Sequence, residues 1–166
     1  YKARACDFED TKASVLGDFV PAKLGMDEGE NAVYMAVTSD FAGYMLFFFQ
    51  NGKVAKVNLN SYETKTNRKK LLNAYSMKEP LSAVLCIRED TNVLITASNG
   101  RMLILPTGLT QAKATKDQQG IQVMKLTKGS TVSEAVVYEQ GMFEDEHRYL
   151  AKDLPSRGDF LKMAQM

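Results

Sequence analysis

Apolar residues in this chain occur in short runs separated by polar turns, a pattern typical of β-strands. The run from Leu46 to Gly52 and the run from Val93 to Gly100 are alike, because each ends in an Asn-Gly pair. The two glycines are 48 positions apart, and each is followed by a basic residue and a second apolar run. Asn-Gly between two such runs favours a hairpin with a type I′ turn, which needs positive φ at both central residues. We therefore predict two β-hairpins.

Two further apolar segments also recur along the chain. The longer one has copies at Ala32–Met35, Ala83–Cys86 and Ala135–Tyr138, which begin 51 and 52 residues apart. A shorter one precedes each copy, at Phe19–Leu24, Leu71–Met77 and Ile121–Leu126. Together with a hairpin, these segments make a unit of four strands in about 50 residues, which is the signature of a propeller blade.

The repeat divides the chain into three blades and a tail. Residues 1–42 are expected to supply most of a partial first blade. Residues 43–90 and 91–140 form the second and third blades, and residues 141–166 form a short helical or irregular tail with a turn at its Arg-Gly-Asp sequence. The predicted fold class is therefore all-β, a partial ring of four-stranded blades. A plain β-sandwich stays open as an alternative, because alternating strands and turns recur there too.

Composition excludes several other classes of protein. The chain has 166 residues, of which 45% are hydrophobic and 25% are charged, as in an ordinary globular domain. The longest strongly apolar run, Tyr44–Phe49, is far shorter than the roughly 18 residues of a membrane-spanning helix, so we expect no membrane contact. A single histidine and two distant cysteines exclude zinc modules built from Cys and His.

Charge is distributed very unevenly along the chain. The formal net charge is only +1, but residues 53–128 hold thirteen bases and five acids, a local charge of +8. The rest of the chain therefore carries −7. Such asymmetry is more informative about binding partners than the total.

The bases also follow the repeat. Lys65 and Lys113 each lie 13 residues after their hairpin glycine, while Lys53 and Arg101 each come directly after one. Equivalent positions of adjacent blades line up around the rim of a propeller, so these bases would form a curved positive stripe. Such a stripe suits a phosphate backbone, which is bound through counterion release without base contacts. Solubilising surface lysines are the plainer interpretation of any single one.

Several segments, in order, resemble one family. They resemble the C-terminal domain of the A subunit of bacterial type IIA DNA topoisomerases, which comprise DNA gyrase and topoisomerase IV. Tyr44–Leu59 and Asn92–Ile104 are similar to blade openings of that domain, and Thr115–Leu126 is similar to its pattern R-x-x-Q-G-V-x-V-M-x-L. Lys12–Gly17 and Arg148–Pro155 resemble other pieces of it.

The resemblance implies a β-pinwheel, a propeller-like disc whose blades exchange strands and whose basic outer edge binds and wraps duplex DNA. The basic heptapeptide Q-R-R-G-G-K-G of gyrase has no match here, and the nearest loop is Lys116–Gly120. Gyrase and topoisomerase IV therefore both stay open. The DNA contacts implied by position are Lys53, Lys56, Lys65, Arg68, Lys69, Lys70, Arg101, Lys113, Lys116 and Lys125.

The resemblance also implies a non-catalytic role within a larger enzyme. In that family the reactive tyrosine lies in a separate domain, and ATP and Mg²⁺ are used by other domains or subunits, so we expect no cofactor here. The implied partners are duplex DNA, the catalytic core of the A subunit and, through it, the B subunit. The implied location is the bacterial cytoplasm, in association with the nucleoid.

One alternative function comes from a different class. A propeller-like protein-interaction module would use the same basic loops to dock an acidic partner. An incomplete ring also leaves an open blade edge, through which copies of the chain are expected to associate.

Overall fold

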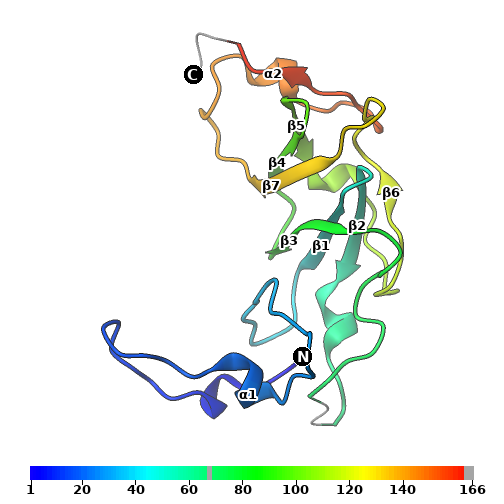
Figure 1. Ribbon diagram of the computed structural model, residues 1–166. Helices are drawn as coiled ribbons and strands as arrows, with labels where there is room; N and C mark the ends of the chain where they lie inside the picture. The colour runs from blue at the N-terminus through cyan, green and yellow to red at the C-terminus, as the bar shows by residue number, and fades with distance from the viewer. Residues whose placement is uncertain (67–68, 163–166) are drawn as a thin grey trace.

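The structure is a computed structural model that describes residues 1–66 and 69–162 (Figure 1). Two antiparallel four-stranded sheets form its centre. The first has the order β3 (Leu81–Ile87), β1 (Tyr44–Phe49), β2 (Lys53–Asn58), β6 (Ile121–Gln122). The second has the order β7 (Val132–Val137), β4 (Asn92–Ala97), β5 (Arg101–Pro106), β8 (Asp159–Phe160). The helices are α1 (Val20–Leu24) and α2 (Glu146–Tyr149), with 3₁₀-helices at Ala5–Asp7, Leu59–Tyr62 and Thr107–Leu109.

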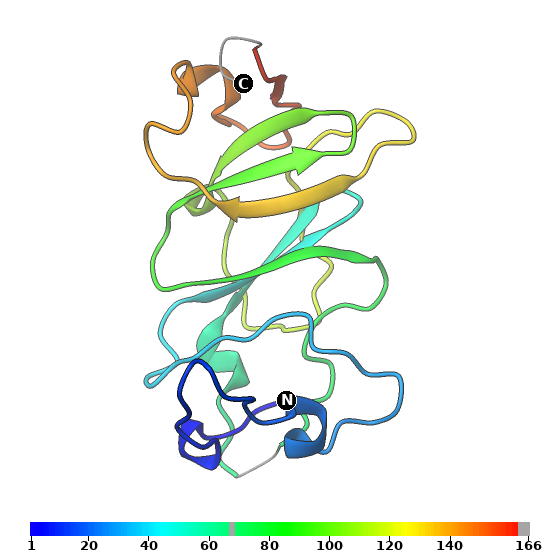
Figure 2. The same ribbon diagram turned by 60° about the vertical axis from the view of Figure 1, so that its left-hand side comes forward.

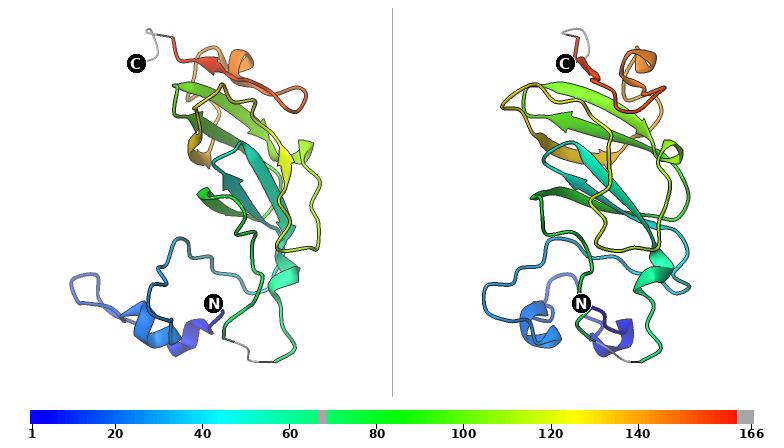
Figure 3. Two further views of the ribbon diagram at one scale, coloured as in Figure 1. Left: turned by 45° about the vertical axis from the view of Figure 1, so that its right-hand side comes forward. Right: turned by 90° about the vertical axis from the view of Figure 1, so that its right-hand side faces the viewer.

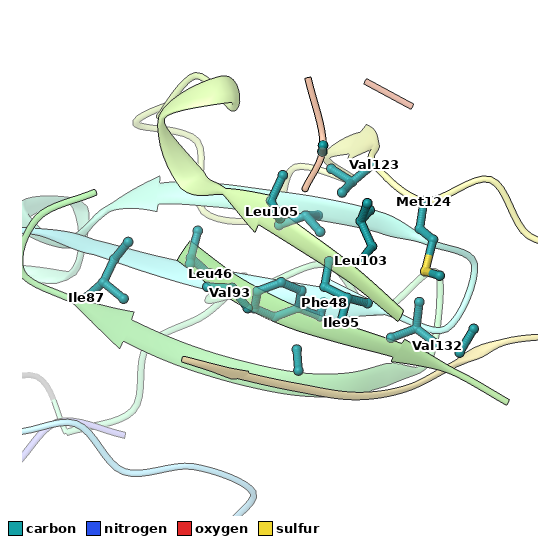
Figure 4. Packing of buried hydrophobic residues seen from close by; sticks show 14 residues of the cluster. Leu46, Phe48, Ile87, Val93, Ile95, Leu103, Leu105, Val123, Met124 and Val132 are labelled. Atoms are coloured by element: carbon teal, nitrogen blue, oxygen red, sulfur yellow. The ribbon is translucent and has the colours of Figure 1, made fainter. Parts of the chain in front are cut away.

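The two sheets stack face to face and enclose the main core (Figures 2 and 4). Side chains alternate between the faces of a strand, so even-numbered residues of β1, such as Leu46 and Phe48, point toward the second sheet. They meet odd-numbered residues of β4, among them Val93 and Ile95. All four side chains are almost completely buried. The two sheets are therefore successive copies of one unit, stacked in the same orientation.

The outward faces of the two sheets are also covered. On the first sheet, Phe47 stacks on Tyr75 with ring centroids 5.5 Å apart. On the second sheet, Tyr149 of α2 is fully buried, and its ring lies 4.8 Å from that of Phe143. The tail thus covers the far side of the second sheet, and Figure 3 shows it at the opposite end of the molecule from the N-terminal segment.

Both predicted hairpins are present, but the predicted turn type is wrong. Each turn closes through a hydrogen bond from the glycine N–H, Gly52 to the carbonyl of Phe49 and Gly100 to that of Ala97. The glycines have φ of 85° and 88°, whereas the asparagines before them have no positive φ. This is a three-residue loop in which only the glycine is left-handed. The asparagine instead uses its side-chain oxygen to accept a hydrogen bond from the residue after the glycine, at 3.0 and 3.1 Å in the two hairpins.

The fourth strand of each sheet comes from later in the chain than the sequence pattern predicts. Strand β6 pairs with β2 of the first sheet, although it follows the second hairpin, and β8 of the tail pairs with β5. The predicted strand at Leu71–Met77 does not form. Adjacent units thus exchange their outer strand, and the tail, expected to be helical or irregular, contributes a strand as well as α2.

A glycine directly before each exchanged strand permits this docking. A Cβ on Gly120 would lie 2.3 Å from the carbonyl oxygen of Val54, and one on Gly158 would lie 2.2 Å from that of Met102. Both glycines have positive φ. Because Val54 and Met102 are 48 residues apart, the two contacts are copies of one another.

Residues 1–42 contain no strand, contrary to the partial first blade expected there. The expected strand at Phe19–Leu24 is α1 instead, which begins with a proline in its first turn and ends at the left-handed Gly25. The segment Ala32–Met35 forms no strand either. It nevertheless runs beside β3, where the Tyr34 hydroxyl accepts a 2.8 Å hydrogen bond from the Cys86 N–H. In the described part of the chain, no helix has the length and apolar character needed to cross a membrane.

Candidate nucleic-acid interface

A basic groove lies where the tips of the two hairpins meet the exchanged outer strands. Its volume is about 550 Å³. Three of its lining residues are bases, Arg101, Lys125 and Arg157, and no carboxylate from the described residues lines it. The remaining lining residues are Asn51, Gln122, Leu126 and Thr127.

Backbone pairing between the outer segments brings the bases of this groove together. The Lys125 N–H donates to the Ser156 carbonyl at 2.8 Å, and the Ser156 N–H donates to the Val123 carbonyl at 2.9 Å. This parallel bridge sets Lys125 beside the segment that carries Arg157. Both side chains are exposed, and neither forms an ion pair within the described residues. They are therefore available to an external anion.

Arg101 is held rigidly by the exchanged strand. Its guanidinium donates to the Gly158 carbonyl at 3.2 Å and lies 4.3 Å from the centroid of the Phe160 ring. An arginine kept in one position by stacking loses little freedom when it binds an anion. Lys53 occupies the equivalent place on the first sheet, where it is half-buried opposite Gln122. We call Lys53, Arg101, Lys125 and Arg157 the tip group.

Ion pairing neutralises Asp159, an acid close enough to Arg101 to be influenced by its charge. Asp159 of β8 accepts hydrogen bonds from Arg148 of α2 at 2.6 and 3.1 Å. The Arg148 guanidinium holds the pKa of Asp159 below its ordinary value. The same pair ties the tail to the second sheet, so the acid serves the fold rather than opposing an anion in the groove.

Lys56 is wrongly predicted as a DNA contact. It is only 4% exposed, and its ammonium donates to Asp90 Oδ1 at 2.6 Å and to the carbonyls of Thr107 and Thr110 at 3.1 Å each. The ammonium also lies 4.4 Å from the centroid of the Tyr44 ring. Even-numbered residues of β2 face the second sheet, so the alternation of the strand directs Lys56 between the sheets. It joins the two blades instead of lining the rim.

The other predicted bases that the structure describes lie at the opposite end of β2 from the hairpin tip. Lys113 runs beside that end, donating to the Lys56 carbonyl and accepting from the Asn58 N–H at 3.0 Å each. Lys116 follows, 5.9 Å from the Tyr62 ring centroid. The loop after Tyr62 carries Lys65, Lys69 and Lys70, which are exposed, whereas Arg68 lies outside the described residues. We call Lys65, Lys69, Lys70, Lys113 and Lys116 the loop group.

The bases thus form two groups along the outer side of the sheets rather than one evenly spaced stripe. Arg157 of the tip group is absent from the sequence prediction. A signal for it does exist, since Gly158 precedes β8 as Gly120 precedes β6, which marks the tail as another copy of the outer segment. In the described residues, no cluster of histidine, cysteine and acidic side chains is arranged to hold a metal ion.

The architecture is that of the β-pinwheel C-terminal domains of type IIA topoisomerase A subunits, and the predicted all-β fold class is confirmed. The C-terminal domain of DNA topoisomerase IV matches with a TM-score of 0.69 and 18% identity, covering 89% of this chain and 51% of that domain. The E. coli ParC C-terminal domain matches at 0.64 and 15%, covering 90% and 68%. The DNA gyrase A C-terminal domain matches at 0.57 and 14%, covering 71% and 43%.

These similarities are structural and concern only part of each domain. The chain spans about half of the length of the topoisomerase IV domain. No protein-family model matches the chain, and no curated protein matches it. At such low identities the likeness establishes the fold and leaves the function to be argued from the site.

Proposed function

We propose that this protein binds duplex DNA without sequence preference, along the outer side of its two blades, and bends it. The observation that carries the proposal is the groove at the hairpin tips, where Arg101, Lys125 and Arg157 converge without a lining carboxylate. The loop group extends the positive surface along the same edge of the first sheet. Phosphates satisfy such a surface through counterion release, which explains why no base-reading motif is needed.

The fold supports the same proposal, because the solved domains that it resembles come from topoisomerases. In this proposal the chain is a non-catalytic part of a type IIA topoisomerase A subunit in the bacterial cytoplasm. It would hold a DNA segment for the catalytic core of that subunit and for the B subunit, which would supply the chemistry.

Bending is the mechanical part of the proposal. Duplex DNA that contacts both groups must follow the rim of two stacked blades. A bend of 40–90° over 20–30 bp costs on the order of 1–6 kcal/mol, which the added phosphate contacts must offset. The tip group and the loop group, at opposite ends of β2, provide contacts on either side of such a bend.

A gel-shift titration across salt concentrations tests the proposal. With about six to ten phosphate contacts, log affinity should fall with log salt at a slope between about −5 and −9. Two duplexes of unrelated sequence should give the same slope and affinity. An affinity that does not change with salt would reject the proposal. Binding of an acidic protein without any binding of DNA would favour an interaction module.

A further inference from the structure

The N-terminal acidic residues contact the loop group directly. Asp27 and Glu30 both bind the Lys70 ammonium, through carboxylate oxygens at 2.7 and 2.8 Å. We call residues 27–30 the acidic turn. Its own hydrogen bonds direct the two carboxylates to one point, since Glu30 accepts from the Asp27 N–H at 2.9 Å and its own N–H donates to the Asp27 carbonyl at 3.1 Å.

The first residues of the chain hold the acidic turn against this loop. The Lys2 N–H donates to the Lys69 carbonyl at 2.6 Å, and the Lys2 ammonium donates to the Thr64 hydroxyl. The Tyr1 hydroxyl donates to Glu30, and the Tyr1 ring centroid lies 5.7 Å from the Lys70 ammonium. Lys70 is thus contacted by two separate parts of the N-terminal segment. Figure 3 shows that segment at the end of the first sheet that lies away from the second sheet.

The contact neutralises a base that would otherwise bind phosphate. Two of the three donors of the ammonium are taken by carboxylates at distances that a phosphate oxygen would occupy. The Lys70 and Tyr1 hydrogen bonds lower the pKa of Glu30 to about 2, so this carboxylate remains charged at any physiological pH. The same carboxylates raise the pKa of Lys70. A phosphate can take these two donors only if the acidic turn leaves.

We propose that the acidic turn is an autoinhibitory latch, which occupies Lys70 in the free protein and is displaced by the DNA backbone. The proposal rests on the proposed function, since it assumes that the loop group binds phosphate. Displacement is feasible because the ion pairs are exposed to solvent, where such pairs are weak. The latch therefore sets a threshold for binding without preventing it.

The test compares two double variants of equal charge. Asp27→Asn with Glu30→Gln removes both carboxylates that contact Lys70. Asp10→Asn with Glu28→Gln removes two acids from the same segment, one of them inside the acidic turn, that form no ion pair within the described residues. The two variants change the net charge equally, so their difference isolates the latch contact.

The latch variant should bind a duplex of 30 bp about three- to tenfold more tightly than the control variant at 0.1 M salt, with a salt slope steeper by about one. In the wild-type chain, the NMR-detected pKa of Glu30 should rise toward its ordinary value when DNA is added. If both variants bind with equal affinity and DNA leaves the pKa of Glu30 unchanged, the latch is disproved while DNA binding stands. If neither variant nor the wild type binds DNA, the proposed function fails, and the latch with it.

Discussion

Replacing Arg101, Lys125 and Arg157 together by glutamine should weaken duplex binding by about two to three orders of magnitude at 0.1 M salt. Each lost phosphate contact makes the slope of log affinity against log salt shallower by about 0.9, so three lost contacts change it by about 2.7. Over the tenfold range from 1 M to 0.1 M salt, that change corresponds to the stated loss of affinity. Glutamine keeps only the first two methylenes of each stem, so the variant also loses the packing of the Arg101 guanidinium on Phe160. The measurement is a fluorescence anisotropy titration at several salt concentrations.

The control for this variant replaces three exposed lysines outside both groups, Lys12, Lys23 and Lys162, by glutamine. It changes the net charge by the same amount, so a general electrostatic effect would weaken binding equally in both variants. We expect the control to keep most of the affinity and most of the salt slope. Equal losses in the two variants would mean that the groove at the hairpin tips has no special part in binding.

Replacing Lys56 by methionine should lower the free energy of unfolding by about 3 kcal/mol. The change removes the three hydrogen bonds of a buried ammonium and takes this donor from the Thr110 carbonyl, whereas the Thr107 carbonyl still accepts from the N–H and hydroxyl of Thr110. Breaking a buried ion pair typically costs 3–5 kcal/mol, and the lower end applies because Asp90 is about half exposed. In a chain of this size the midpoint of thermal unfolding should fall by about 6–12 °C.

Lys53→Met is the matched control, because Lys53 lies on the same strand with its side chain only half-buried. Its cost should stay within about 0.5 kcal/mol, as is usual for a surface change. The free energy of unfolding of each variant is measured by urea unfolding, and the two values are compared. If Lys56→Met were no less stable than Lys53→Met, the ion pair between the blades would not hold them together.

The architecture was largely predictable because its signals are local and repeated. The Asn-Gly pairs ending at Gly52 and Gly100 mark both hairpins. The apolar copies at Ala83 and Ala135 mark β3 and β7, which lie at the opposite edge of each sheet from the exchanged strand. The exchange of outer strands was not predictable from the same signals. Strand β6 has only two residues, and its partner β2 lies more than 60 residues earlier, so nothing local to either strand identifies the pairing.

The basic site was predictable in composition but not in geometry. Charge counts identify a base at position 56 without telling whether it faces solvent, whereas the parity of β2 does, because Val54 and Lys56 point to the same buried face. Arg157 shows the converse, since its Arg-Gly-Asp sequence indicates a turn but gives no reason to place it beside Lys125. The ion pairs of Lys70 with the N-terminal acids likewise join residues about 40 positions apart, which no spacing rule connects.

Cleavage of DNA from a tethered reagent tests most directly whether the duplex lies along the outer side. The two native cysteines are first removed by Cys6→Ser and Cys86→Ser. An iron chelate is then attached either at Thr127→Cys, in the groove, or at Val137→Cys, on β7 at the opposite edge of the second sheet from β8. The account predicts hydroxyl-radical cuts in both strands of any duplex from position 127 and none above background from position 137. Cuts of equal strength from both positions, or from position 137 alone, would contradict it.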